Sequence, residues 1–152
     1  MHPPLFASGI LRALPFAALA LGACGASPAA MPSATPPSLV GHAWAWQGAR
    51  NPTGERIVVS APDRYTIEFM ADGVVRVRAD CNRGSGRFST GPGARLTLGP
   101  IATTKMGCPD GSQDRLFLKM LGSVARYRFE GTHLVLAASG EEATMRLDAL
   151  EK

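Results

Sequence analysis

Residues 71–88 read ADGVVRVRADCNRGSGRF, and this stretch decides how the folded part of the chain is built. Ala71-Asp72-Gly73 has the composition of a tight turn. After it, apolar and charged residues alternate, as in a strand that buries one face. The apolar face would carry Val75, Val77, Ala79 and Cys81, and the polar face Arg76, Arg78 and Asp80. Gly84 and Gly86 predict a sharp bend before a short strand at 87–89.

Similar alternation recurs along the chain from Leu39 to Lys152. Further strands are expected at 42–47, 65–69, 95–98, 101–104, 125–130, 134–138 and 143–148. One helix is expected after a cap at Asp110 or Ser112, since apolar residues recur there at helical spacing: Leu116, Phe117, Met120, Leu121 and Val124. Trp44 and Trp46 alternate on one strand and are assigned to the core. Many short strands with one helix predict a mainly β fold, a small antiparallel β-barrel-like domain.

The first 23 residues differ in character and are predicted to be a lipoprotein signal peptide. Their apolar run, Ala13 to Ala23, is too short to cross a bilayer but has the length of a signal-peptide core. Leu21-Gly22-Ala23-Cys24 fits a bacterial lipoprotein cleavage site, in which the cysteine is acylated. Pro15 within the run disfavours a buried helix. Simple secretion is the alternative.

Residues 24–38 are expected to form a lipidated cysteine and its tether. Several acyl chains on Cys24 would hold the protein on a membrane stably. The following segment is rich in Pro, Ala and Ser and carries no charge, so it should stay extended and solvated. Gly25, rather than Asp, after the cysteine favours export to the outer membrane. We therefore expect an outer-membrane lipoprotein facing the periplasm, or alternatively a soluble periplasmic or secreted protein.

Charge gives no support to a nucleic-acid partner. The chain has 16 basic and 12 acidic residues, and loss of Arg12 with the signal leaves a net charge of about +3. This balance is too mild for a domain that binds nucleic acid.

The three cysteines predict one disulfide. If Cys24 is acylated, Cys81 and Cys108 remain and can pair, in a compartment where disulfides persist. A metal or redox pair is the alternative. His42 and His133 do not lie at ligand spacing from either cysteine, so we expect neither a metal nor a cofactor.

Several short motifs together resemble the META domain family, also called HslJ-like. They are Trp44-Ala45-Trp46, Cys81-Asn82 followed by Gly84, Thr104-Lys105-Met106-Gly107-Cys108, Leu116-Phe117, Leu134-Val135-Leu136 and Met145-Arg146-Leu147. The resemblance spans residues 39–147, nearly all of a domain placed at 39–152. The chain departs from the family pattern at Trp46, where Leu is more frequent, and at Asp80, where a small residue such as Gly is common. The resemblance implies a barrel-like fold, a frequent role as an envelope lipoprotein linked to heat or antibiotic stress, and no established catalytic chemistry.

Two groups of residues are candidates for interaction. Asn82 ends a strand and tolerates a left-handed backbone, so it is expected to be a turn residue, with a polar contact to a peptide or ligand as the alternative. Arg76, Arg78, Arg83 and Arg87, with Arg95, could gather on adjoining strands and meet anionic headgroups or lipopolysaccharide phosphates. A solvated face balanced by Glu68 and Asp80 is the simpler interpretation.

No catalytic constellation can be assembled, since the histidines fall in turn-like contexts. We therefore predict a non-enzymatic, monomeric envelope lipoprotein, bound to the membrane through Cys24 and acting in stress tolerance through a protein or envelope surface. The alternative is a barrel that binds a small apolar or amphipathic ligand. An interior filled by side chains would argue against that alternative, and a cavity of several hundred Å³ would support it.

Overall fold

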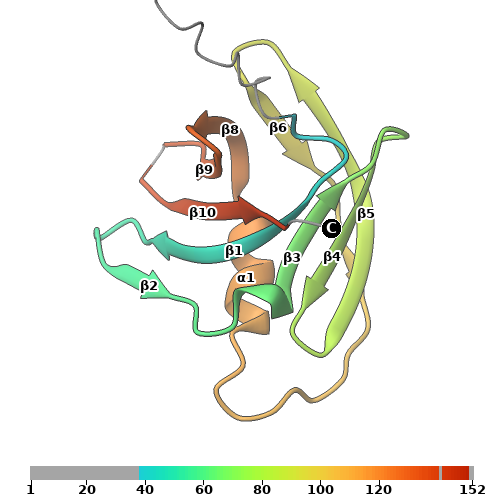
Figure 1. Cartoon of the computed structure of the whole chain (residues 1–152), viewed down its shortest axis with the longest axis vertical. Helices are drawn as coiled ribbons and strands as arrows, with labels where there is room; N and C mark the ends of the chain where they lie inside the picture. The colour runs from blue at the N-terminus through green and yellow to red at the C-terminus, as the bar shows by residue number, and fades with distance from the viewer. Residues whose placement is uncertain (1–37, 141, 151–152) are drawn as a thin grey trace, which may run out of the picture. The chain divides into compact units, whose positions relative to one another are not determined.

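The computed structural model describes residues 38–140 and 142–150 (Figure 1). The predicted signal peptide, Cys24 and the tether up to residue 37 lie outside the described residues. The strands are β1 (Ala43–Arg50), β2 (Arg56–Val58), β3 (Tyr65–Phe69), β4 (Val74–Ala79), β5 (Asn82–Gly91), β6 (Arg95–Leu98), β7 (Ala102–Thr103), β8 (Val124–Glu130), β9 (His133–Ala138) and β10 (Thr144–Ala149). The helices are the 3-10 turn η1 (Pro62–Arg64) and α1 (Asp114–Leu121). Neither of these helices is long and apolar enough to cross a membrane.

The strands form a closed antiparallel barrel of eight strands, which confirms the predicted fold class. The order around it is β1-β3-β4-β5-β6-β8-β9-β10, and β10 pairs with β1 to close the ring. β2 and β7 are additional strands, paired with β1 and β5 respectively. In the view of Figure 1, α1 lies behind β1, and its Phe117, Met120 and Leu121 are buried.

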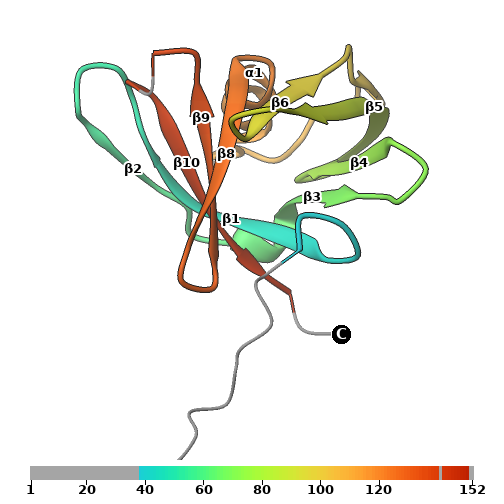
Figure 2. The same ribbon diagram turned by 90° about the horizontal axis from the view of Figure 1, so that it is seen from above.

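Strand β1 belongs to both halves of the barrel. On one edge it pairs with β10 along its whole length, with a bulge at Gln47. On the other edge, its first residues pair with β3 and its last residues pair with β2. Figure 2 shows β1 passing between β10, β9 and β8 on one side and β3, β4 and β5 on the other.

The shortest strand pairing in the barrel is the one between β6 and β8. A single Cα pair, Arg95 with Arg126, joins these strands. Two further bonds reinforce it: Tyr127 N–H donates to the Ala94 carbonyl at 3.0 Å, and Arg126 Nη1 donates to the Gly93 carbonyl at 2.9 Å.

Apolar side chains fill the barrel interior. The buried cluster is made of Leu39, Trp44, Trp46, Val59, Tyr65, Ile67, Phe69, Val75, Val77, Ala79, Leu96, Phe117, Met120, Leu121, Leu134, Leu136, Met145 and Leu147. The Trp46 ring, 0% exposed, stacks on Phe117 of α1 with a centroid distance of 5.2 Å. Tyr65 meets both rings edge-on. The two tryptophans are in the core, as predicted, and one of them packs against the helix.

Both buried indoles also have hydrogen-bond acceptors for their N–H groups. Trp44 Nε1 donates to the Leu39 carbonyl at 3.1 Å, and Trp46 Nε1 donates to the Gly48 carbonyl across the bulge at 2.8 Å. A buried polar group without a partner would destabilise the fold, so these two bonds allow large aromatic rings in so small a core.

The predicted bend at Gly84 and Gly86 is wrong. The chain turns earlier, at Asp80-Cys81, and β5 then runs through both glycines. They are needed because the segment of β7 crosses close to β5. A Cβ atom at Gly84 would lie 2.7 Å from the Ala102 carbonyl oxygen, and one at Gly86 would lie 2.9 Å from that of Pro100.

The helix is shorter than its apolar spacing predicts. It begins at Asp114, preceded by Gln113, whose N–H donates to the Tyr65 hydroxyl at 2.9 Å. Ser112 Oγ accepts a bond from the Asp114 N–H at 3.3 Å. Val124, expected on the helix, begins β8 instead because the helix ends at Leu121, before Gly122 and Ser123.

We expect Trp46→Ala to lower the free energy of unfolding by about 3–5 kcal/mol, because it removes the ring on which α1 packs. Trp46→Leu, the more frequent family residue, should cost less. Urea denaturation followed by circular dichroism measures both. Val58→Ala is the control: Val58 is 76% exposed, and its truncation should stay within about 0.5 kcal/mol. Equal effects of Trp46→Ala and Val58→Ala would contradict this view of the core.

Candidate functional site

The turn between β4 and β5 sets the position of the Cys-Asn motif. Asp80 has a φ of 58°, in the left-handed region that glycine occupies without strain. Its carboxylate is buried and forms an ion pair with Arg64 of η1. Its N–H also donates to the Arg64 carbonyl at 2.7 Å. The departure from the family's small residue is therefore accommodated by Arg64.

Asp80 does not contribute to the outer charged face, although strand alternation places it there. The turn rotates its side chain inward, where it is 2% exposed. The expectation that Asp80 balances the arginines of β4 and β5 is therefore wrong.

The predicted pairing of the two remaining cysteines is present as a disulfide. Cys81 in the turn is bonded to Cys108 in the loop that leads to α1, with a Cα–Cα distance of 5.6 Å. The two cysteines are 27 residues apart in the sequence. In the chain-entropy model, closing a loop of that length stabilises a fold by about 3–4 kcal/mol. The disulfide ties the loop at residues 104–113 to the end of the barrel.

Asn82 holds the same loop through its side-chain amide. Its Oδ1 accepts bonds from Met106 N–H at 2.8 Å and from Thr104 Oγ1 at 2.9 Å. Its Nδ2 donates to the Met106 carbonyl at 3.2 Å and to the Asp114 carboxylate at 3.3 Å. The side chain is 4% exposed, so it acts inside the chain and has little surface to offer to a partner.

A hollow of about 630 Å³ lies beside Asn82, under the loop and the start of α1. Its lining mixes basic residues, Lys105 and Arg115, with acidic ones, Asp110 and Asp114. The charges of this hollow therefore select neither an anion nor a cation.

The candidate arginines lie together on the outer side of one strand pair. We call this surface, made of Arg76, Arg78, Arg83 and Arg87, the β4–β5 face. Arg78 is opposite Arg83 in the register, and Arg76 is opposite Ser85. Arg95 lies farther along, on β6 opposite Gly91.

No ion pair neutralises the β4–β5 face within the part of the chain that the structure describes. Glu68 is opposite Arg76 on β3 but forms no ion pair with it. Arg78 donates to the main-chain carbonyls of Asp80 and Asp63, both at 3.3 Å. The face therefore keeps its positive charge.

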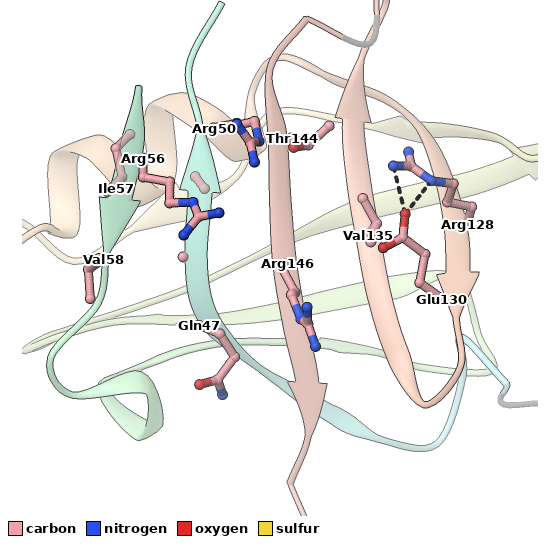
Figure 3. Close-up of a pocket in the computed structure, with 12 residues that line it drawn as sticks. Gln47, Arg50, Arg56, Ile57, Val58, Arg128, Glu130, Val135, Thr144 and Arg146 are labelled. Atoms are coloured by element: carbon pink, nitrogen blue, oxygen red, sulfur yellow. Dashed lines mark hydrogen bonds and ion pairs between the residues drawn. The ribbon is translucent and has the colours of Figure 1, made fainter. Parts of the chain in front are cut away.

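A second group of arginines lines a groove of about 540 Å³ on the outer side of β2, β1, β10, β9 and β8 (Figure 3). We call it the arginine groove; its basic residues are Arg50, Arg56, Arg128 and Arg146. Arg128 is paired with Glu130 at 2.9 Å, as the dashed lines in Figure 3 show. Val135 faces the groove and is nevertheless buried, so the floor is apolar.

The arginine groove was not predicted from the sequence. Arg146 is far along the chain from Arg50 and Arg56, and β2 was not recognised as a strand. The alternation at Arg126, Arg128 and Arg146 indicates outward side chains, but it does not say which strands are neighbours.

The two histidines lie in separate places. His42 is exposed and meets the Trp44 ring edge-on at a centroid distance of 5.9 Å. His133 Nδ1 contacts the Asp148 carboxylate across the β9–β10 pair. Among residues 38–140 and 142–150, no three His, Cys, Asp or Glu side chains gather as a metal site requires.

The model of the META domain matches residues 37–151, which include the barrel, the disulfide and the Asn82 network. The chain belongs to the META domain family. The family match covers the barrel strands and α1 together, so the Trp44, Cys81-Asn82 and Cys108 motifs are parts of one META domain.

Two solved structures share the fold of this META domain. A protein from Burkholderia xenovorans, solved by NMR, is 18% identical with a TM-score of 0.63, and the match covers 83% of this chain and 99% of that one. A DUF4847 family protein from Bacteroides vulgatus is 13% identical with a TM-score of 0.56, covering 75% and 96% respectively. No curated protein matches the chain. These likenesses support the fold alone.

We expect Asn82→Asp at neutral pH to destabilise the META domain by about 2–4 kcal/mol, despite its identical shape. It would replace an N–H donor by a carboxylate oxygen facing the Met106 carbonyl and the Asp114 carboxylate. Asn82→Ala should cost a similar amount, because it leaves the Met106 N–H unpaired. Thr90→Ala, on the exposed end of β5, is the control. Urea unfolding of the oxidised protein provides the measurement. If neither Asn82 variant changes the free energy of unfolding, this side chain does not stabilise the domain as we describe.

Proposed function

We propose that this META domain protein is a non-enzymatic cell-envelope lipoprotein. Its acylated Cys24 would anchor it in the outer membrane, facing the periplasm, and residues 24–38 would tether the barrel to the lipid. In this role it would contribute to heat or antibiotic stress tolerance through contacts of its outer surface with the envelope.

The observation that carries the proposal is the uncompensated charge of the β4–β5 face. Arg76, Arg83 and Arg87 are exposed and form no ion pair with any described residue. A basic residue near an anionic membrane surface is worth about 1 kcal/mol of attraction. The face would therefore be drawn to phosphate-bearing headgroups.

An anchor and a basic face would act together. A lipid chain keeps the barrel near the bilayer, so each weak contact of the face becomes an intramolecular event with a high effective concentration. Stable attachment commonly requires two such signals.

The filled interior favours this proposal over a ligand held inside the barrel. Large side chains occupy the space that an apolar ligand would need: Trp44, Trp46, Phe69 and Phe117 are all at most 1% exposed. An eight-stranded barrel is only just wide enough to be filled by its own side chains. The outer surface is therefore where a partner would be met.

One fractionation experiment tests the anchor and the face together. Wild type should remain with the outer membrane in a high-salt wash. The chain from residue 24 with Cys24→Ala, exported by an ordinary secretory signal, should stay on membranes at low salt and leave them at high salt. Adding Arg76→Glu and Arg83→Glu to that variant should release it at both salt concentrations.

The matched control for the face is a double reversal elsewhere, Arg115→Glu with Lys119→Glu, which changes the net charge equally on exposed positions of α1. It should behave like the Cys24→Ala parent. Release of the wild type by salt would contradict the lipid anchor. Equal release by the two double reversals would contradict a specific role for the β4–β5 face.

A further inference from the structure

The arginine groove concentrates positive charge in a concave site. Arg50, Arg56 and Arg146 all line it and form no ion pair with any described residue. Its one lining acid, Glu130, is already paired with Arg128. The groove therefore has a net positive charge that nothing in the described chain neutralises.

Arg50 and Arg56 are directly opposite each other in the β1–β2 register. Like charges in that position repel across a distance of about 5 Å between Cβ atoms, which destabilises the strand pair. β2 has only three residues, so it has few other contacts to offset the repulsion. A bound anion would convert this repulsion into attraction.

The other two cross-strand arginine pairs of the barrel are relieved internally. In the Arg78–Arg83 pair, Arg78 donates to two main-chain carbonyls. In the Arg95–Arg126 pair, Arg126 donates to the Gly93 carbonyl. Within the described residues, the guanidinium groups of Arg50 and Arg56 have no such acceptor, and both line the arginine groove.

The nearest acid along the chain, Glu55, forms no ion pair with these arginines. Glu55 Oε2 accepts a bond from Asn51 Nδ2 at 2.9 Å. The Asn51 carboxamide oxygen in turn accepts bonds from the N–H groups of Thr53 and Glu55. The side chain of Glu55 is therefore hydrogen-bonded within the β1–β2 turn.

The backbone of the groove is fixed before any ligand binds. Gly48, beside the bulge of β1, lets β2 approach so closely that a Cβ atom there would lie 2.6 Å from the Ile57 carbonyl oxygen. From the helix side, Gln113 Nε2 donates to the Val58 carbonyl at 3.2 Å. Because the backbone of β1 and β2 is held in place, binding would not have to order it, which lowers the entropy cost of binding.

We propose that the arginine groove binds a phosphate ester, with Arg50, Arg56 and Arg146 holding the phosphate group. Guanidinium groups match phosphate oxygens through paired, charge-assisted hydrogen bonds, and three of them suit a dianion better than a single carboxylate. The groove exceeds the size of phosphate alone, and exposed Val58 offers apolar contact to the body of the ligand. The site lies on other strands than the β4–β5 face and does not rest on the proposed membrane role.

Phosphate ester groups have two sources here: a soluble phosphorylated molecule and a monoester lipid headgroup. Inorganic phosphate is the probe for the shared chemistry. Vesicles of phosphatidylcholine with and without phosphatidic acid are the probe for the lipid source. Saturable shifts with inorganic phosphate, and none added by phosphatidic acid, would assign the groove to soluble esters. Tighter binding to phosphatidic acid vesicles, lost in the same variants, would assign it to lipid.

The test is an NMR titration of the exported chain carrying Cys24→Ala with inorganic phosphate, matched in ionic strength by chloride. Amide signals of Gly48, Ile57 and Val135 should shift and saturate with phosphate but not with chloride. Arg50→Gln and Arg146→Gln should each weaken the Kd at least about tenfold, the worth of a hydrogen bond to a charged group. Arg115→Gln, on the exposed side of α1, should leave the Kd unchanged.

A second readout guards against a purely structural effect. In chloride alone, Arg50→Gln should raise the melting temperature because it removes the repulsion with Arg56. In phosphate, only proteins that bind it should gain further stability. The proposal is overturned if phosphate and chloride act alike, if Arg50→Gln binds phosphate as tightly as its parent, or if the shifts are confined to the β4–β5 face.

Discussion

The stacking of Trp46 on Phe117 is the contact on which the rest of the structure depends. Trp46 comes from the strand shared by both halves of the barrel, and Phe117 comes from its one α-helix. Their contact lies in the buried core and packs α1 against the barrel. The interior of the barrel is therefore filled by its own side chains, and the surfaces that we propose for binding lie on its outside.

The family motifs around Cys81 and Cys108 together join the β4–β5 turn to the loop that precedes α1; we call this contact the junction. Asn82 bonds to Thr104 and Met106, and the adjacent disulfide joins the same two segments. The junction holds the loop that delivers α1, and the Tyr65 hydroxyl receives the N–H of Gln113 at the start of that helix. The motif residues thus serve the core, which leaves the outer strand positions free to differ in charge. The β4–β5 face and the arginine groove both use such positions.

Much of this structure could be predicted from local sequence patterns. The features that could not be predicted depend on which segments become neighbours in space. Alternation at Tyr65, Ile67 and Phe69 placed those side chains in the core, because strand geometry alone fixes which face they share. Gly84 and Gly86 were misjudged because the close approach of another segment, rather than a turn, requires them. Arg50 and Arg56 face each other only through a register that no local pattern encodes. The β4–β5 face was found because a short turn joins its two strands.

The most direct test of a filled barrel uses the two buried indole N–H groups as reporters. Their NMR signals would be recorded while N-phenyl-1-naphthylamine, an uncharged apolar probe, is added to the folded protein. We predict that the Trp44 and Trp46 signals stay in place, since both rings lie in a packed core and donate hydrogen bonds to the chain's own carbonyls. Saturable shifts of both signals would show that the interior admits a ligand, and would contradict the claim that this META domain acts through its outer surface.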